Sequence, residues 1–281
     1  MKHFYIFIFF LLVTIQGDAI ALVDFDQSME TMPVFGYLSA DDIHWFNFLK
    51  ALYQKNSLCM LSTSTELKIP KIIHQIWIGG QLPQEFKELT ESWQRMHPDW
   101  IYKLWTDADI ETFPFYNKTL FDAATNYGQK SDIWRYEILY RYGGLYVDTD
   151  FFALKPFDML HYCYDFYTGI GSTGTVDILN GLIGSAPGHP ILAHAITTMK
   201  STSNHCDGIM YTTGPVHFMI SFLSVVPQCA GTIIAFPCSF FYPSANCKRF
   251  LTRQAQDSYI KPESFAIHYW ASSWQKIYPH I

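Results

Sequence analysis

Short apolar runs and helical repeats alternate in the first half of this chain. The largely apolar run Ile72–Ile78, ended by a double glycine, predicts a strand buried on both faces of a sheet. A helix is expected over about Gln84–Met96, because the His-Pro pair that follows disfavours further helix. Ile101–Trp105 predicts a second strand, after which Thr106 or Asp107 caps a short helix. The order is therefore strand, helix, strand.

A further helix is predicted over residues 132–142, with Ser131 as its N-cap and Asp132 in its first turn. Gly143-Gly144 ends this helix, and Leu145–Val147 predicts a short strand. Alternating strands and helices predict an α/β fold with parallel strands. Ligands of such sheets bind beyond the carboxyl ends of the strands.

The two ends of the chain differ from this pattern. Residues 22–66 predict a helical N-terminal appendage, in which Ser39 and Asp42 form a capping box. Residues 67–281 are expected to form the catalytic domain, and its second half is a looser mixture of loops and short strands. That half contains one clear helical stretch near Pro190–Lys200.

The first 21 residues resemble an export signal. Lys2 precedes the apolar run Phe4–Ile15, and Ala19-Ile20-Ala21 places small residues where a signal peptidase cuts. The run is short for a membrane span of about 20 residues. A cleaved signal peptide is therefore predicted over residues 1–21, with an uncleaved signal anchor as the alternative.

The cysteine count agrees with export. Six cysteines lie after this segment and none forms a C-x-x-C pair, so disulfides are favoured over zinc. Cys238 with Cys247, and Cys206 with Cys229, are the suggested pairs, although spacing alone leaves the pairing open.

Composition narrows the class of partner. The net charge is −6 and no Lys/Arg cluster stands out, which argues against a nucleic-acid partner. Aromatic residues make up 17% of the chain, a density that suits stacking on sugar or nucleobase rings as well as a large core.

The acidic pair Asp148 and Asp150 directly follows a predicted strand. In an extended segment, residues two apart point the same way, so both carboxylates would face one point. Two such charges about 5 Å apart repel by about 3 kcal/mol at an effective dielectric constant of about 20. A divalent cation reverses the sign of this energy, so the pair predicts half of a metal site.

Five ordered blocks between Leu67 and Trp274 resemble the DXD-motif sugar transferases, glycosyltransferase family 32. The blocks are Ile69–Gly79, Ser131–Tyr136 with Tyr142–Asp150, Asn180-Gly181 with Gly188–Pro190, Thr213–Pro215, and His268–Trp274. The family includes fungal mannosyltransferases, bacterial polysaccharide transferases and toxin glucosyltransferase domains. The resemblance implies a GT-A (Rossmann-like) nucleotide-sugar-binding domain that uses Mn²⁺ or Mg²⁺ and retains anomeric configuration.

The resemblance also implies roles for individual residues. Asp150 would bind the metal, and Asp148 would share it or accept hydrogen bonds from ribose and sugar hydroxyls. His268 or Ser272 would complete the metal shell. Arg135 would act with both carboxylates in catalysis, as a fork-shaped hydrogen-bond donor.

The remaining implied contacts are with the donor nucleotide sugar. Trp77 would stack on the nucleobase, Tyr146 would lie beside the ribose, and Asp132 with Arg135 would touch the sugar. The other donor-binding residues implied are Ile76, Asn180, Trp270 and Trp274.

The sequence thus predicts a metal-dependent retaining glycosyltransferase that moves a hexose from a GDP- or UDP-linked donor to a glycan, glycolipid or protein acceptor. The enzyme would work in the lumen of the secretory pathway or Golgi, or it would be secreted, with delivery to another cell as one possibility. An uncleaved signal anchor would add contact with the membrane.

One alternative is a secreted, metal-dependent carbohydrate-binding module without turnover. A D-x-D phosphatase is disfavoured, because Phe151-Phe152 follow the motif and it lies far from the start of the domain. The donor, its nucleotide and the acceptor stay open.

Overall fold

The computed structural model describes residues 23–30, 40–61, 65–172, 176–200 and 206–271. The expected leader, the capping residue Ser39, and the site residues Ser272 and Trp274 lie outside these ranges.

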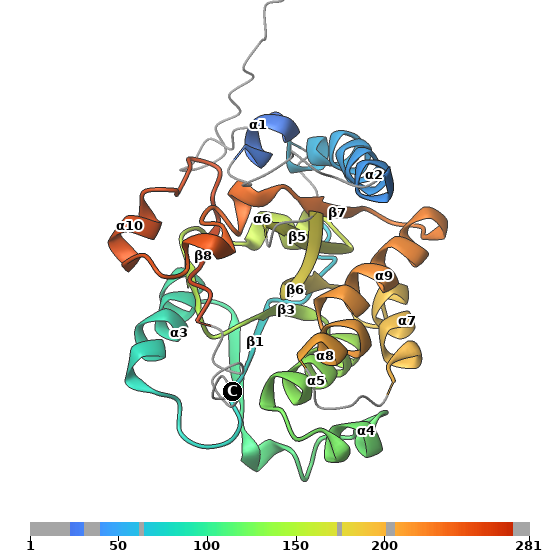
Figure 1. The fold of residues 1–281 in the computed structure, drawn as a ribbon, viewed down its shortest axis with the longest axis vertical. Helices are drawn as coiled ribbons and strands as arrows, with labels where there is room; N and C mark the ends of the chain where they lie inside the picture. The colour runs from blue at the N-terminus through green and yellow to red at the C-terminus, as the bar shows by residue number, and fades with distance from the viewer. Residues whose placement is uncertain (1–22, 31–39, 62–64, 173–175, 201–205, 272–281) are drawn as a thin grey trace, which may run out of the picture.

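A six-stranded mixed sheet forms the centre of the domain, in the order β2-β1-β3-β6-β5-β7 (Figure 1). β1 is parallel to β2 and β3, and β5 is parallel to β7, whereas β6 runs antiparallel to both of its neighbours. The α/β class predicted from the sequence is confirmed. The strands are β1 Ile72–Ile76, β2 Ile101–Trp105, β3 Gly144–Val147, β5 Phe166–Ser172, β6 Val176–Ser185 and β7 Ile233–Phe236.

A second, two-stranded sheet joins distant parts of the chain. β4 (Phe151–Ala153) follows β3 after a tight turn and pairs antiparallel with β8 (Ala266–His268). Phe151 and His268 are opposite each other in this pair. Trp93 of α3 (Gln84–Met96) donates its indole N–H to the Phe151 carbonyl at 3.2 Å, which fixes β4 against that helix. The pairing places the C-terminal segment beside the acidic motif.

Helices cover the central sheet as an α/β fold requires. The group α5, α7, α8 and α9 lies together on one side of Figure 1, whereas α3 and α10 lie on the other. Tyr136 of α5 stacks on Phe218 of α9, with ring centroids 5.8 Å apart. The helices are α4 Lys118–Ala123, α5 Tyr127–Tyr142, α6 Asp158–Cys163, α7 Pro190–Thr198, α8 Cys206–Thr212, α9 Pro215–Val225 and α10 Arg253–Asp257. Short 3₁₀ turns are η2 Asp107–Asp109, η3 Val226–Gln228, η4 Cys238–Phe240 and η5 Asn246–Lys248.

Local signals predicted the first βαβ unit well. The predicted bounds of α3 and β2 are confirmed, and β1 ends at Ile76, two residues earlier than expected. Thr106 is the N-cap of η2, in a capping box with Asp109. The predicted helix near Pro190–Lys200 is α7, which ends at Thr198.

The predicted start of α5 is wrong. The helix begins at Tyr127, because the Asn126 side chain accepts hydrogen bonds from the backbone N–H groups of Gly128 and Gln129. Ser131 and Asp132 therefore lie inside the helix, and the N-terminal dipole does not act on Asp132 as expected. Gly143 ends the helix as predicted, with a φ of 62° that favours glycine.

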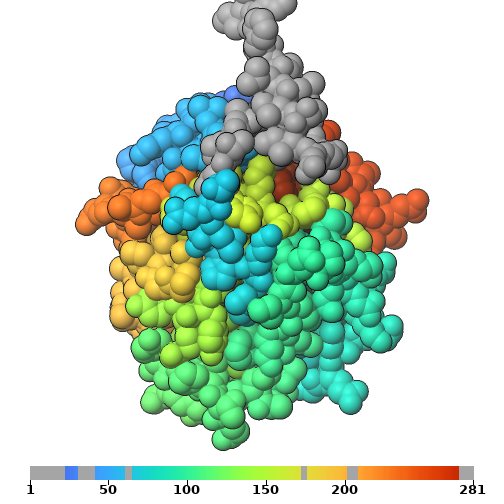
Figure 2. Space-filling model, turned by 180° about the vertical axis from the view of Figure 1, so that it is seen from behind, coloured from blue at the N-terminus to red at the C-terminus, as the bar shows by residue number. Residues whose placement is uncertain are grey.

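The N-terminal residues pack onto the sheet. They form α1 (Phe25–Met29), α2 (Ala40–Asn56) and η1 (Ser57–Leu61), which lie at one end of the domain in both views (Figures 1 and 2). Phe25 and Tyr53 are buried in the same apolar cluster as the strands. Asn56 Nδ2 donates to the Ile233 carbonyl of β7 at 2.7 Å. The predicted helical appendage thus shares the core of the domain.

The expected Cys238–Cys247 disulfide is wrong, because both thiols are free: Cys238 is buried in η4 while Cys247 is exposed in η5. Cys229 is a free thiol as well, and it lies beside the Ala230 carbonyl at 3.4 Å. The side chain of its suggested partner, Cys206, lies outside the described residues.

The stretch Gly208–Gln228 has the length and apolar composition of a membrane span, but it is divided between the end of α8, the separate helix α9 and the turn η3. Half of its most apolar window is buried inside the domain. A core helix of a soluble protein passes the same test, so the stretch is weak evidence for a membrane span.

Candidate active site

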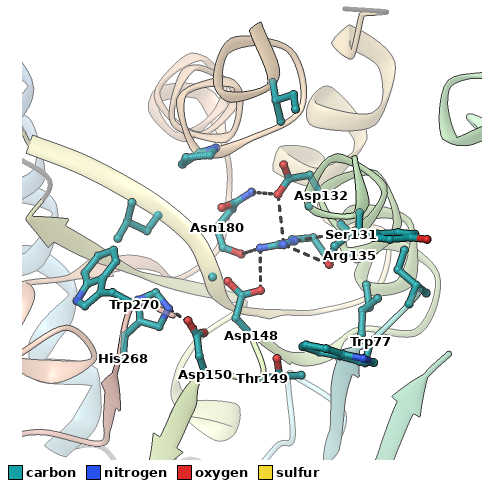
Figure 3. Close-up of a pocket in the computed structure, with 18 of the residues that line it drawn as sticks. Trp77, Ser131, Asp132, Arg135, Asp148, Thr149, Asp150, Asn180, His268 and Trp270 are labelled. Carbon is teal, nitrogen blue, oxygen red and sulfur yellow. Dashed lines mark hydrogen bonds and ion pairs between the residues drawn. The ribbon is translucent and has the colours of Figure 1, made fainter. Parts of the chain in front are cut away.

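A pocket of about 380 Å³ opens at the carboxyl ends of β1 and β3 (Figure 3). This volume is in the range of small-molecule sites. It is lined by residues 76–79 at the end of β1 and just after it, by one face of α5, by residues 148–150, by residues 179–181 of β6, and by residues at the end of β8 and just after it. The position agrees with the expectation that ligands bind beyond the carboxyl ends of parallel strands.

Asp148 and Asp150 flank the turn between β3 and β4. The Asp148 N–H donates to the Gly181 carbonyl at 2.8 Å, and the Phe151 N–H donates back to the Asp148 carbonyl at 3.2 Å. The two carboxylates thus face one point because the chain turns at Thr149, not because the segment is extended as the sequence suggested.

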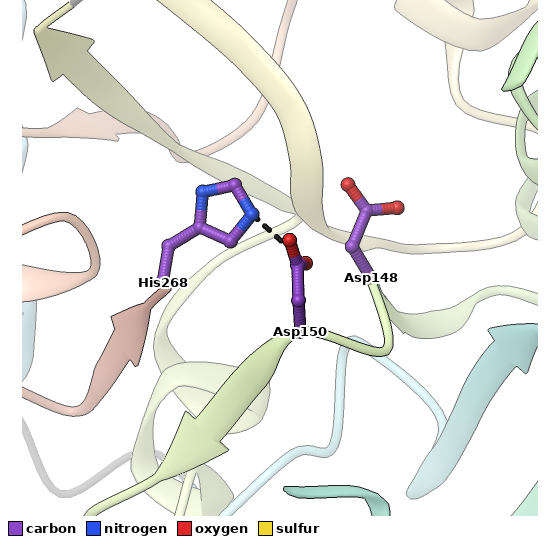
Figure 4. A group of neighbouring side chains, drawn as sticks. All are labelled: Asp148, Asp150 and His268. Carbon is purple, nitrogen blue, oxygen red and sulfur yellow. Dashed lines mark hydrogen bonds and ion pairs between the residues drawn. The ribbon is translucent and has the colours of Figure 1, made fainter. Parts of the chain in front are cut away.

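His268 joins this acidic pair. Its ligand atom and those of Asp148 and Asp150 all lie within 4.8 Å of one another (Figure 4). His268 Nε2 lies 2.9 Å from Asp150 Oδ1, and Nδ1 is buried with no hydrogen-bond partner among the described residues. Two carboxylate oxygens and an imidazole nitrogen suit Mn²⁺ or a similar divalent ion. These three residues therefore fit the metal that the resemblance implies.

The two carboxylates have different environments. Burial raises the pKa of Asp148 above its usual range, and the nearby Asp150 adds to this shift, although Arg135 opposes it. Burial acts in the same direction on Asp150, but His268 and the Ala271 N–H, which donates at 2.8 Å, hold its pKa below the usual range. Asp150 is thus the better stabilised anion.

Arg135 connects the walls of the pocket from α5. Its Nη1 donates to the Asn180 carbonyl at 2.8 Å and lies 3.2 Å from Asp148 Oδ1. Nη2 lies 3.3 Å from Asp132 Oδ1 and 3.4 Å from Ser131 Oγ, and Nε donates to the Ser131 carbonyl at 3.3 Å. All three guanidinium nitrogens therefore have protein partners. In this structure Arg135 orients its neighbours more than it offers hydrogen bonds to a ligand.

Asp132 and Asn180 form a buried polar pair above this arginine. Asn180 Nδ2 donates to Asp132 Oδ1 at 2.8 Å. Burial raises the pKa of Asp132 to about 7, even though Arg135 opposes the shift. Both residues line the pocket, so the structure brings them to the place that the sequence predicted.

The aromatic residues lie at opposite ends of the pocket (Figure 3). Trp77, half-buried after β1, lies at one end with Ile76, and its ring packs against Phe86 with centroids 5.1 Å apart. Trp270 lies at the other end beside His268, with its indole N–H donating to the Ser244 carbonyl at 2.8 Å.

Tyr146 does not line the pocket. It is buried below it, where the Arg135 guanidinium lies 4.5 Å from its ring. Its hydroxyl donates to Asp148 Oδ1 at 2.7 Å, so Tyr146 positions that carboxylate.

Sequence reasoning missed Tyr242, which is buried and lines the pocket between Phe151 and Trp270. Its hydroxyl lies near the backbone of Leu182 but has no hydrogen-bond partner of good geometry among the described residues. Its position in the apolar run before Pro243 resembles that of a core residue, so no local signal marked it. Ser131 and Thr149 also line the pocket.

Comparison with known proteins agrees with the motif blocks. Residues 83–167 match the family model described as a glycosyltransferase sugar-binding region containing a DXD motif. Inositol phosphoceramide mannosyltransferase 3 of Schizosaccharomyces pombe is 33% identical over 168 residues, which cover 56% of this chain and 44% of the relative. Mannosyl phosphorylinositol ceramide synthase SUR1 of Saccharomyces cerevisiae is 32% identical over 170 residues, covering 56% and 41% respectively. The chain thus spans less than half the length of these relatives.

Among solved structures, the PaToxG glycosyltransferase is similar, with a TM-score of 0.46 and 21% sequence identity over 67% of this chain and 81% of that one. This likeness concerns the fold alone. The resemblance to DXD-motif sugar transferases seen in the sequence is confirmed by this match over residues 83–167.

Proposed function

We propose that this protein is a metal-dependent retaining glycosyltransferase that moves a hexose from a nucleotide sugar to a lipid-linked acceptor. One observation carries the proposal: Asp148, Asp150 and His268 converge on one point of a pocket that also holds Trp77 and the Asp132–Asn180 pair. A binding module has no need for this combination of cation ligands and a nucleobase-sized aromatic wall.

The three converging residues would hold the divalent ion. When bound, the ion supplies Lewis-acid stabilisation of the charge on a leaving diphosphate. The ring and carboxylate are already in contact, with His268 Nε2 lying 2.9 Å from Asp150 Oδ1. Little rearrangement of the main chain is therefore needed to form the site.

The remaining residues would bind and orient the donor. Trp77 offers a half-buried ring on which a nucleobase can stack. Asp132 and Asn180 offer polar atoms to sugar hydroxyls, and Arg135 holds Asp132 and Asp148 in place. Trp270 closes the opposite end and limits access of water, whose attack on the donor is the competing reaction.

Retention of configuration is proposed to follow a front-face route. The bond from the anomeric carbon to the diphosphate oxygen breaks, and a bond to the acceptor oxygen forms on the same face. The acceptor hydroxyl proton passes to the departing phosphate oxygen. This route needs no covalent intermediate on the protein.

The names of the relatives suggest the first substrates to test. Both fungal relatives are named for mannosyl transfer to a phosphoinositol-headed ceramide. GDP-mannose and an inositol phosphorylceramide are therefore the leading donor and acceptor, ahead of UDP-linked hexoses. The predicted leader and the acceptor class together favour a secretory-pathway lumen as the place of work.

The test is release of GDP or UDP by the purified chain with Mn²⁺, first without and then with acceptor. GDP-mannose, UDP-glucose, UDP-galactose and UDP-GlcNAc would be compared, each with and without a chelator. We expect one donor to be cleaved slowly alone and faster with acceptor, and Asp150→Asn to abolish both rates. Equal rates in the chelator, or saturable sugar binding without cleavage of any donor, would reject the proposal.

A further inference from the structure

A solvent-facing loop beside the pocket carries two exposed apolar side chains. Phe250 is 84% exposed, the highest value among the large apolar residues that the structure describes, and Leu251, which follows it, is 42% exposed. Isolated exposed apolar residues are common, but adjacent ones at this level of exposure indicate a contact surface. The loop, residues 246–252, consists of η5 and the turn that leads from it to α10.

Backbone hydrogen bonds hold this loop in a fixed shape. The Lys248 N–H donates to the Ala245 carbonyl at 2.8 Å, and the Leu251 N–H donates to the Lys248 carbonyl at 2.9 Å. The Arg249 guanidinium lies 4.4 Å from the centroid of the Phe250 ring. The two apolar side chains are therefore presented by an ordered turn.

The charge of this region is opposite to that of the whole chain. Residues 243–256 contain Lys248, Arg249 and Arg253 and no acidic residue, although the chain carries a net charge of −6. Arg253 reaches Glu88 of α3, with 3.7 Å between Nη1 and Oε2. Lys248 is exposed, and it makes no ion pair within the described ranges. The loop thus offers positive charge next to apolar surface.

This loop adjoins the mouth of the pocket. Asn246 lines the pocket, and Arg249 Nη1 donates to its Oδ1 at 2.6 Å. Tyr127, which is 45% exposed, also lines the pocket. The adjoining α10 segment projects from the side of the molecule (Figures 1 and 2).

We propose that residues 248–251 dock on an anionic lipid bilayer, with Phe250 and Leu251 entering the interface and Lys248 and Arg249 facing the headgroups. Docking there would place the mouth of the pocket at the membrane surface. This inference rests on the proposed function in one respect, because a lipid acceptor would then reach the site without leaving its bilayer.

The experiment places a polarity-sensitive fluorophore on the full chain at Phe250→Cys. A matched control carries it at Ile101→Cys, because Ile101 is 66% exposed but begins β2 at the end of the sheet away from the pocket. The exposed Cys247 is replaced by Ser in both, and the labelled Cys247→Ser chain gives the background from other thiols. Vesicles of phosphatidylcholine with phosphatidylserine are compared with phosphatidylcholine alone.

We expect emission from position 250 to shift to the blue with the anionic vesicles and much less with the neutral ones, and position 101 to stay unchanged. Lys248→Glu should raise the lipid concentration at half-maximal shift by about fivefold or more. No shift at position 250, an equal shift at position 101, or no effect of Lys248→Glu would overturn the proposal.

Release of nucleoside diphosphate in lipid-free solution separates this inference from the proposed function. Phe250→Ser and Lys248→Glu should leave that rate unchanged, because neither residue lines the pocket. A chain that docks but cleaves no donor would reject only the function, and one that cleaves but does not dock would reject only the membrane surface.

Discussion

Arg135 Nη1 lies 3.2 Å from Asp148 Oδ1, and the arginine side chain is almost completely buried. Its planar fork also contacts Asp132 and Asn180, which a lysine ammonium cannot do at the same time. Arg135→Lys should therefore lower kcat/KM by about 10²-fold, as small displacements of reacting groups do. The measurement is the initial rate of nucleoside diphosphate release.

The matched control is Arg95→Lys, because Arg95 makes an exposed ion pair with Glu91 on α3 at 3.8 Å. Exposed pairs contribute about 0–1 kcal/mol, so this change should affect neither rate nor stability. If Arg135→Lys keeps the wild-type rate, Arg135 does not organise the pocket.

Asp150→Asn should weaken Mn²⁺ binding by about 10-fold or more, because an amide lacks the charge that stabilises the cation. His268→Ala should weaken it less if the two carboxylates dominate. Titration calorimetry with Mn²⁺ alone measures both, without relying on turnover. Asp122→Asn, in an exposed pair with Lys118, is the control and should bind like wild type. Equal affinity in Asp150→Asn would remove this residue from the metal site.

Tyr242→Phe removes a hydroxyl that has no hydrogen-bond partner of good geometry among the described residues. The free energy of unfolding should therefore change by no more than about 0.5 kcal/mol. Turnover should fall by about tenfold if the hydroxyl meets a ligand in the pocket, which is a difference of about 1.4 kcal/mol. Urea unfolding and donor cleavage measure the two effects.

Tyr167→Phe is the comparison for this change. The Tyr167 hydroxyl lies 2.9 Å from buried His161 Nε2, so removing it should cost about 1–3 kcal/mol of stability. The opposite pattern, in which Tyr242→Phe loses stability and keeps its rate, would make Tyr242 an ordinary core residue.

Stability should fall as the pH drops below about 6.5, because the chain buries neutral histidines. Burial lowers the pKa of His74 to about 4 and that of His161 to about 3. Between the folded and unfolded pKa values, these histidines are protonated in the unfolded chain but neutral in the folded one. Their contribution to the free energy of unfolding is therefore fully present above the unfolded pKa, and it is lost as the pH falls towards the folded pKa. Each unit of pKa difference corresponds to about 1.4 kcal/mol.

Urea unfolding at several pH values tests this expectation. His161→Gln should flatten the dependence of the unfolding free energy on pH, because one of the titrating groups is gone. His44→Gln, at an exposed position of α2, should leave the slope as it is. A slope unchanged by His161→Gln would mean that other groups set the acid sensitivity.

Elements with strong local signals could be predicted from the sequence. A proline after His97 ends α3, and the threonine before Asp107 caps η2, so short-range chemistry determines both. The start of α5 could not be predicted reliably, because Asn126 and Ser131 are both good caps and only packing chooses between them.

The site was predictable in part for a similar reason. The acidic pair is two residues apart, but His268 is 118 residues from Asp150 and reaches it only through the β4–β8 pairing. Spacing gives no sign of such a contact, and the family resemblance supplied it. Tyr242 was marked neither by its spacing from other site residues nor by the family resemblance. The predicted Cys238–Cys247 disulfide was wrong because the spacing of cysteines along the chain does not indicate that Cys238 is buried.

Asn56 Nδ2 donates to the carbonyl of Ile233 in the edge strand β7, and α2 packs beside that strand. Bare strand edges recruit other strands and lead to aggregation. Helix α2 therefore covers that edge of the sheet. A fragment that starts at residue 67 would expose the edge of β7 and the apolar surface on which Phe25 packs. Recombinant versions intended for crystallisation should therefore keep the N-terminal helices α1 and α2.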